Sequence, residues 1–205
     1  MNFSGIAEEI SAYIAGMPLL EAAGVVASLL YTLLAARERI ICWIFGLISS
    51  AIYVYICVEA KLYQDAIINI YYFGMAIYGW ILWNSRPGRS DNHIRISSMA
   101  FPKLLIILLA GAVLTAASGT AFSYFTDASL PYMDAFTTVF AFIATWLQAK
   151  KIVQNWLLFL VVDFVSIFLF GIKGYYFSSL LFLIYTVICI FAYLQWRKKA
   201  HAPSV

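Results

Sequence analysis

Long apolar stretches, separated by short polar or charged segments, make up most of this chain. Seven of them are long enough to cross a bilayer as helices, which takes about 20 residues. They cover residues 19–36, 40–58, 64–83, 101–123, 132–149, 153–171 and 175–196. The pattern therefore predicts an all-α integral membrane protein with seven transmembrane helices.

The apolar pattern also contains an internal repeat. Residues 34–83 align without a gap on residues 147–196 when they are shifted by 113 positions. The shift superposes identical aromatic residues at Trp43 and Trp156, Tyr63 and Tyr176, Tyr72 and Tyr185, and Trp83 and Trp196. Repeats of this kind in a hydrophobic chain are typical of transporters whose substrate site lies between two similar bundles.

The repeat divides the chain into two parallel three-helix units, residues 19–85 and 132–198. The intervening segment, residues 86–131, holds a loop and an apolar stretch that has no repeat partner, so we expect a linker helix. An odd helix between the units keeps them parallel, because three helices alone would invert the second copy. Residues 199–205 follow as a tail. The predicted layout is three, one, three.

Residues 1–18 are too short and too polar to cross a bilayer. Apolar side chains recur there at helical spacing, opposite Glu8 and Glu9, at Ile6, Ile10, Tyr13 and Ile14. This pattern predicts an amphipathic helix that lies on the outer membrane interface. A disordered tail with accidental periodicity is the alternative.

Composition and charge agree with a membrane protein and give it an orientation. The chain is 64% hydrophobic and only 11% charged, against about 25% charged residues in soluble domains. With the N-terminus outside, Lys61 and Lys173 are the only basic residues in outer segments, and the other eleven Lys and Arg are cytoplasmic. Cytoplasmic loops are enriched in Lys and Arg. The net charge of +3 therefore reports topology and not nucleic-acid binding.

Metal, redox and nucleotide chemistry have no support in the sequence. Cys42, Cys57 and Cys189 lack metal or redox spacing and are expected to be small packing residues. The two histidines, His93 and His201, fall in a loop and the tail. No phosphate-binding loop is present, so we expect no enzyme, no cofactor and no ATP-driven step.

The outstanding polar residue is Asp163, at the middle of the stretch 153–171. A carboxylate at this depth is costly, and intramembrane ionisable residues are usually functional. Its repeat counterpart is Ser50, at the middle of the stretch 40–58. Repeat symmetry predicts that the two face each other across the pseudo-twofold axis. The alternative is an Asp held by neighbouring hydroxyls for packing alone.

Aromatic residues share the predicted helix face of Asp163. Positions 156, 159 and 163 follow helical spacing, and a carboxylate beside aromatic rings suits an organic cation. Asn69 interrupts the symmetry, either as interhelical glue or as a ligand contact. The predicted substrate-binding residues are Asp163, Trp156, Phe159, Asn155, Ser50, Asn69, Trp43 and Tyr72.

Other polar or aromatic residues lie at helix ends and have simpler explanations. Glu21 and Asp134 each begin a repeat, where they are expected to stabilise a helix N-terminus; a gate contact is the alternative. Trp80, Trp83 and Trp196 fall where interfacial aromatic belts are expected.

Four short motifs resemble those of the Pnu family of bacterial vitamin transporters: Glu21-Ala22-Ala23-Gly24, Phe45-Gly46-Leu47-Ile48, Tyr78-Gly79-Trp80 and Asn155-Trp156-Leu157-Leu158. The three-one-three plan is also similar to that of the SWEET sugar transporters. The resemblance implies a multi-pass protein of the bacterial inner membrane that imports an unphosphorylated B-vitamin precursor. It further implies facilitated diffusion by alternating access, trapping of the product by cytoplasmic phosphorylation or pyrophosphorylation, and assembly as a homotrimer.

Members of the family divide among nicotinamide riboside, thiamine and riboflavin. The riboside branch carries Trp-x-x-Trp-x-x-x-Asn where this chain has Trp156, Phe159 and Asp163, and a Gln where it has Asn69. An ionised Asp163 favours the two cationic vitamins, and thiamine adds an exocyclic amine. These residues predict thiamine first and nicotinamide riboside second. A passive channel or a receptor for a small organic cation is the alternative from another class.

Overall fold

The chain is all-α in the computed structural model, which describes residues 3–84, 95–125 and 129–201. These described residues form eight helices, and the all-α prediction is confirmed. The helices are α1 (Phe3–Gly16), α2 (Leu19–Ala36), α3 (Cys42–Glu59), α4 (Tyr63–Asn84), α5 (Phe101–Phe125), α6 (Pro131–Ala149), α7 (Asn155–Ile172) and α8 (Tyr176–Ala200).

Six of these helices are long and apolar enough to cross a membrane, so the protein is a multi-pass membrane protein. They are α2, α3, α4 from Asp65 onward, α5, α7 and α8. The predicted span 132–149 coincides with α6, which is not among the six. Several polar residues lower the hydropathy of α6, and Thr145 and Gln148 are both buried there. The layout of seven spans therefore stays a prediction.

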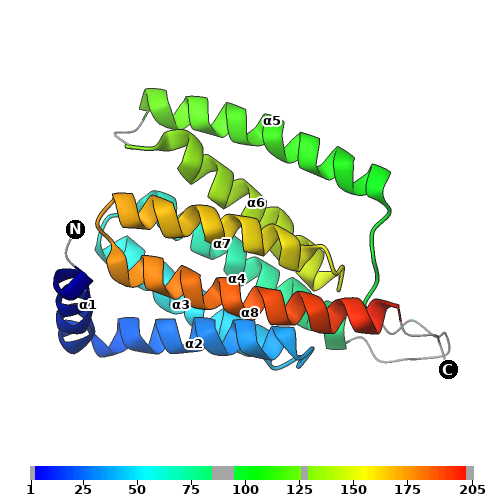
Figure 1. Ribbon diagram of the computed structural model, residues 1–205, viewed down its shortest axis with the longest axis horizontal. Coiled ribbons are helices and arrows are strands. Elements are labelled where there is room, and N and C mark those ends of the chain that lie inside the picture. Colours follow the sequence, from blue (N-terminus) through cyan, green and yellow to red (C-terminus); the bar gives the residue numbers. More distant parts are fainter. Residues whose placement is uncertain (1–2, 85–94, 126–128, 202–205) are drawn as a thin grey trace.

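Helices that follow one another along the chain pack together in two groups. In one group α3 packs on α2 and α4, and in the other α7 packs on α6 and α8. Contacts of α2 with α8 and of α4 with α6 join the groups, and α5 packs along α6 at the edge of the molecule (Figure 1). The central space between the two groups is therefore bordered by six helices.

Turns 113 residues apart have the same unusual backbone. Among the described residues, a positive φ occurs at Glu38 (56°) and Lys151 (53°), and at Lys61 (57°) and Gly174 (80°). All four lie just beyond the end of a helix, where a left-handed residue commonly terminates the helix. All four helices α2, α3, α6 and α7 thus end in the same way, and in each turn the following N–H donates to a carbonyl five residues earlier.

The short helix α1 lies crosswise at one end of the bundle (Figure 1). Its Tyr13 donates a hydrogen bond to the carboxylate of Glu21 on α2, and its ring lies 5.0 Å from that of Phe177 on α8. Burial raises the pKa of the Tyr13 hydroxyl to about 12, and the hydrogen bond to Glu21 adds to the shift. A helix was predicted within residues 1–18; its placement on a membrane interface stays a prediction.

Candidate functional site

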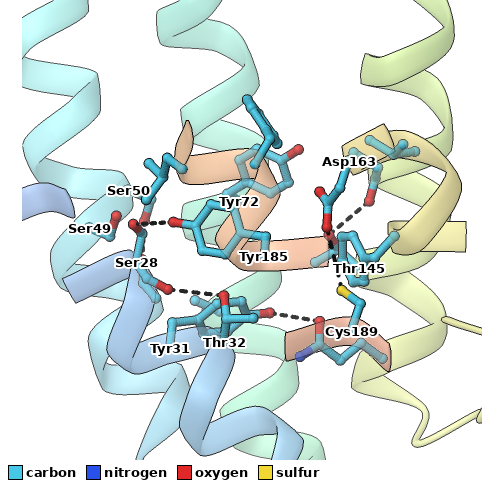
Figure 2. Close-up of a pocket in the computed structure, with 18 of the residues that line it drawn as sticks. Ser28, Tyr31, Thr32, Ser49, Ser50, Tyr72, Thr145, Asp163, Tyr185 and Cys189 are labelled. Carbon is cyan, nitrogen blue, oxygen red and sulfur yellow. Dashed lines mark hydrogen bonds between the residues drawn. The ribbon is translucent and has the colours of Figure 1, made fainter. Parts of the chain in front are cut away.

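A cavity of about 350 Å³ lies in the central space between the two groups of helices (Figure 2). Its 22 lining residues come in equal numbers from α2–α4 and from α6–α8. Eighteen of them form nine pairs separated by 113 positions: Ser28/Ala141, Thr32/Thr145, Trp43/Trp156, Gly46/Phe159, Ser49/Val162, Ser50/Asp163, Asn69/Phe182, Tyr72/Tyr185 and Ala76/Cys189. The two walls of the cavity thus use equivalent positions of the repeated sequence.

Seven of the eight residues predicted to bind substrate line this cavity, and Asn155 does not. Asn155 is fully buried at the start of α7. Its amide nitrogen donates to the carbonyl of Ile152, at 2.6 Å. The amide nitrogen of Asn155 therefore closes the turn between α6 and α7, whereas its buried Oδ1 has no hydrogen-bond partner among the described residues.

Asp163 is the only charged side chain among the described residues that line the cavity. It is 5% exposed, and its Oδ2 accepts a hydrogen bond from the thiol of Cys189 at 3.4 Å (Figure 2). A thiol is a weak donor, and an ionised carboxylate has about four acceptor sites. Most of the hydrogen-bonding capacity of Asp163 is therefore open to a ligand. Cys189 was predicted to be a packing residue, and the structure adds this contact to its role.

Ser50 lies on the opposite wall of the cavity from Asp163 (Figure 2). Its hydroxyl donates to the carbonyl of Gly46 at 2.7 Å, which satisfies its hydrogen within α3. Its lone pairs can still accept from a ligand. Asn69 behaves similarly, because its amide nitrogen donates to the Asp65 carbonyl at 2.9 Å. Both residues thus offer acceptor oxygens to the cavity.

Hydroxyl groups connect the two walls. The Ser28 hydroxyl and the Tyr185 hydroxyl are 2.6 Å apart, and the Tyr31 hydroxyl donates to Oε1 of Gln148 at 3.1 Å. Sequence reasoning missed all four residues. Tyr185 had a visible signal, since it is the repeat counterpart of Tyr72, whereas the other three gave none.

Two buried tryptophans, Trp43 and Trp156, line the cavity at the starts of α3 and α7, next to the turns after α2 and α6. This end of the cavity is called its floor below. Trp43 and Trp156 are each 1% exposed, and the indole Nε1 of each has no hydrogen-bond partner among the described residues. A buried N–H without an acceptor costs about 1–3 kcal/mol, so each calls for an explanation. Both residues line the cavity.

The floor tryptophans rest on a second pair below them. Trp43 meets Trp83 edge-on, with centroids 5.4 Å apart, and Trp156 meets Trp196 in the same way at 5.5 Å. Trp196 is fully buried, and the indoles of Trp83 and Trp196 donate hydrogen bonds to main-chain carbonyls. The interfacial belt predicted for Trp196 is therefore wrong, because its ring is fully buried, whereas for the half-buried Trp83 it stays a prediction.

The cavity is chemically asymmetric although its plan is symmetric. At four pairs of positions, the α2–α4 wall carries small or polar residues where the α6–α8 wall carries apolar or charged ones. The pairs that show this are Ser28/Ala141, Gly46/Phe159, Ser50/Asp163 and Asn69/Phe182. At these positions one wall therefore offers hydroxyl and amide groups, and the other offers two phenyl rings and a carboxylate.

A second cavity of about 350 Å³ is lined by residues of α4, α5, α6, α7 and α8. It lies toward the end of the molecule where α1 lies. It shares Tyr72 and Phe182 with the central cavity, as well as Ala141 and Val162. Asp134 lines it and forms an ion pair with Lys173, at 2.7 and 2.9 Å. The Asp134 carboxylate thus joins the start of α6 to the turn after α7.

Comparisons with known proteins agree with this architecture. A family model described as "nicotinamide mononucleotide transporter" matches residues 18–198. The nicotinamide riboside transporter PnuC of Escherichia coli (strain K12) is 25% identical over 205 residues, covering 88% of this chain and 86% of that protein. The riboflavin/roseoflavin transporter RibM of Streptomyces davaonensis is 27% identical over 132 residues, covering 63% and 62%.

A solved structure has the same fold. The crystal structure of the vitamin B3 transporter PnuC superposes with a TM-score of 0.74 at 19% identity. The match covers 95% of this chain and 88% of that chain.

Proposed function

Since the chain belongs to the nicotinamide mononucleotide transporter family, we propose that it imports an unphosphorylated, positively charged B-vitamin precursor, with nicotinamide riboside as the first candidate. Its relatives are transporters and not enzymes, and it is a multi-pass protein of the inner membrane. The observation that carries the proposal is the lone carboxylate of Asp163 in a cavity walled by aromatic rings.

The charge of the cavity favours a riboside over a mononucleotide. Phosphate groups in proteins are usually bound by Arg or Lys side chains or by helix N-termini. None of the described lining residues is Lys, Arg or His. Asp163 would also repel a phosphate, whereas a pyridinium ring gains from both the carboxylate and the aromatic faces.

The relatives reverse the order of candidates reached from sequence. Two of the proteins that this chain resembles are named nicotinamide riboside transporters, from E. coli and from Neisseria mucosa. Thiamine becomes the second candidate, because it also carries one fixed positive charge and an exocyclic amine that Asp163 can bind. Riboflavin is neutral and gains nothing from the carboxylate.

The asymmetric walls suggest how nicotinamide riboside would lie. We place its pyridinium ring between Phe159 and Phe182, with the carboxamide N–H groups toward Asp163. The ribose hydroxyls then face the polar wall, where Ser50 and Asn69 offer acceptor oxygens. An oxygen of the ligand would also accept from Trp43 or Trp156, whose indole N–H groups are otherwise unused.

The membrane arrangement that we propose is the three-one-three layout with seven spanning helices. The repeats are residues 19–85 and 132–198, joined through α5. Although α6 is less apolar than its neighbours, Thr145 and Gln148 are 5% and 1% exposed, so these polar side chains would not meet lipid. The basic turns after α2 and α6 lie at the same end as the C-terminus of α8 (Figure 1), which supports a cytoplasmic C-terminus and an outer N-terminus.

The mechanism that we propose is facilitated diffusion by alternating access. The substrate brings its own positive charge to Asp163, so the central cavity needs no co-transported cation. Each half-cycle would open the cavity to one side of the membrane through movement of α2–α4 against α6–α8. Cytoplasmic phosphorylation or pyrophosphorylation would then trap the vitamin. Assembly as a homotrimer, which the family resemblance implies, is part of the proposal.

Binding of candidate ligands to the purified protein tests the substrate. Tryptophan fluorescence follows titrations with nicotinamide riboside, thiamine, riboflavin and nicotinamide mononucleotide. We expect nicotinamide riboside to bind most tightly and Asp163→Asn to weaken it about 10- to 100-fold, since a hydrogen bond to a charged group contributes about 1.5–3 kcal/mol. Glu59→Gln, which removes an exposed carboxylate outside the cavity, serves as the control. Equal binding by parent and Asp163→Asn would refute the role of Asp163.

A passive channel is the competing function. A carrier exchanges labelled substrate inside liposomes for unlabelled substrate outside, and its uptake rate saturates. Uptake that rises linearly with concentration and shows no exchange would favour the channel.

A further inference from the structure

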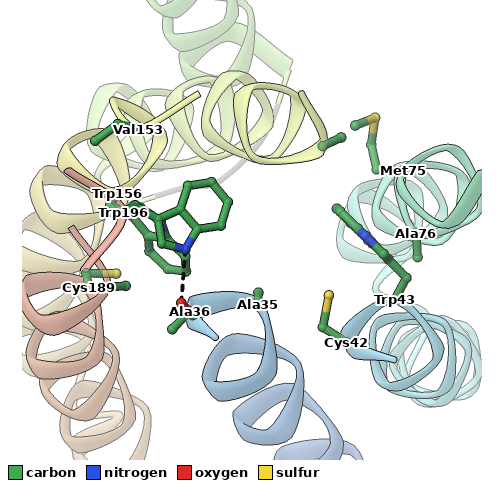
Figure 3. Packing of buried hydrophobic residues seen from close by; sticks show 12 residues of the cluster. Ala35, Ala36, Cys42, Trp43, Met75, Ala76, Val153, Trp156, Cys189 and Trp196 are labelled. Carbon is green, nitrogen blue, oxygen red and sulfur yellow. Dashed lines mark hydrogen bonds between the residues drawn. The ribbon is translucent and has the colours of Figure 1, made fainter. Parts of the chain in front are cut away.

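The two groups of helices are tied together below the cavity floor by a reciprocal pair of hydrogen bonds. The indole of Trp83 on α4 donates to the carbonyl of Ala149 at the end of α6, at 2.9 Å. The indole of Trp196 on α8 donates to the carbonyl of Ala36 at the end of α2, also at 2.9 Å (Figure 3). The last carbonyls of a helix have no partner within it. Each bond therefore satisfies a free acceptor of the opposite group.

An ion-pair cluster reinforces this junction. Glu38, in the turn after α2, lies 2.5 Å from the ammonium group of Lys199 on α8 and 3.6 Å from that of Lys151 in the turn after α6. The Lys151 ammonium also lies 4.7 Å from the centroid of a Trp83 ring. All of these contacts join α2–α4 to α6–α8 at one end of the molecule.

We propose that the reciprocal bonds of Trp83 and Trp196, together with the Glu38 cluster, are the gate that closes the cavity toward the cytoplasm. The inference rests on the proposed transport function and adds the residues that hold one state of the cycle. The gate lies at the end that carries the basic turns, directly below the floor. Opening this end requires both indoles to leave the carbonyls of Ala36 and Ala149.

The floor tryptophans connect the gate to the substrate. Trp43 and Trp156 each line the cavity, and each packs edge-on against a gate ring. A ligand that packs against Trp43 and Trp156 therefore touches rings in contact with Trp83 and Trp196. Substrate binding and gate opening therefore involve the same four packed rings, so a shift of the floor rings on binding acts directly on the gate rings.

Cys42 is a built-in reporter of this gate. It is fully buried and belongs to the same packed cluster as Ala36, Trp43 and Trp196 (Figure 3). In a Cys57→Ser, Cys189→Ser background it is the only cysteine of the chain. The experiment measures the rate at which a charged maleimide labels Cys42 in protein reconstituted in nanodiscs.

We expect Trp83→Phe and Trp196→Phe each to speed Cys42 labelling about two- to tenfold, because each removes one hydrogen bond from the closed state and keeps an aromatic, although smaller, ring. The double variant should show about the product of the two effects. Trp146→Phe removes an indole that takes part in neither bond, and should label at the parent rate. Salt should speed Cys42 labelling of the parent, because it screens the ion pairs of Glu38. Glu38→Gln should also speed labelling and should abolish this effect of salt.

A second reporter separates gate opening from a loosened fold. Cys57 is buried near the opposite end of α3, and it becomes the only cysteine when Cys42 and Cys189 are replaced by Ser. Equal acceleration at Cys42 and Cys57 would overturn the gate, and so would parent-like labelling of Cys42 in both Trp variants. Labelling requires no substrate, so a failed substrate assignment would leave this result intact.

Discussion

Gly79 provides a sharp test of the cavity floor. A Cβ atom at Gly79 would lie 2.3 Å from two carbons of the Trp43 ring, whereas carbon atoms in contact are about 3.5–4.0 Å apart. The ring or α4 must therefore move by roughly 1.2 Å or more. Trp43 has little room to move, because it is 1% exposed and also meets Trp83 edge-on.

We predict that Gly79→Ala destabilises the protein by about 1–3 kcal/mol, the usual cost of overpacking a core. At about 2–4 °C per kcal/mol for a chain of this size, the thermal midpoint should fall by roughly 2–12 °C. Displacement of Trp43 should also weaken binding of nicotinamide riboside. Both effects can be read by tryptophan fluorescence, in a thermal scan and in a titration.

Gly74 supplies the matched control on the same helix. A Cβ there meets nothing within 4 Å, and Ala is the better helix former by about 1 kcal/mol. Gly74→Ala should therefore keep or raise the thermal midpoint and leave affinity unchanged. If Gly79→Ala matched Gly74→Ala in both measurements, the close packing of Trp43 on α4 would be wrong.

Two further predictions concern individual contacts, and a third concerns the energetics of transport. Asn155→Ala should lower stability by about 1–2 kcal/mol through loss of one buried hydrogen bond yet change the Kd for nicotinamide riboside less than twofold; a large loss of affinity in a titration would return Asn155 to the site. Lys173→Met leaves the half-buried Asp134 without its ion-pair partner and should lower the free energy of unfolding by about 1 kcal/mol or less. The thermal midpoint should fall slightly at low salt and should match the parent in 1 M salt. A drop that is the same at both salt concentrations would contradict an electrostatic cause. Uptake into liposomes should need neither a sodium nor a proton gradient, and accumulation that an uncoupler abolishes would show coupled transport.

Much of the helical plan could be predicted because a bilayer leaves the backbone few choices. Backbone N–H and C=O groups in hydrocarbon must form their hydrogen bonds within the segment, so long apolar stretches become helices. Seven of the eight helices match predicted membrane stretches within a few residues. The position of Asp163 in the cavity could be expected for the same reason, since a charge in this setting must avoid lipid. The repeat also anticipated which residues are equivalent, such as Trp43 and Trp156.

The remaining features depend on packing distances that no local pattern encodes. Nothing in the sequence indicates that the Trp196 indole reaches Ala36, or that Cys189 approaches Asp163. These contacts depend on where α2 and α8, or α7 and α8, come together. Asn155 shows the opposite case. Its spacing in the sequence suits a ligand contact, but at the α6–α7 turn its amide nitrogen donates to a backbone carbonyl and the residue does not line the cavity. Thr145 and Gln148 similarly lowered the hydropathy of α6, although both are buried within the bundle.

The most direct test of the proposed role of Asp163 is uptake of labelled nicotinamide riboside into liposomes that contain the purified protein and carry no ion gradient. We expect saturable uptake by the parent that stops at equal concentrations on both sides, and a strong loss of the initial rate with Asp163→Asn but not with Glu59→Gln. Undiminished uptake by Asp163→Asn would contradict the claim that a buried carboxylate in the central cavity binds the cationic substrate.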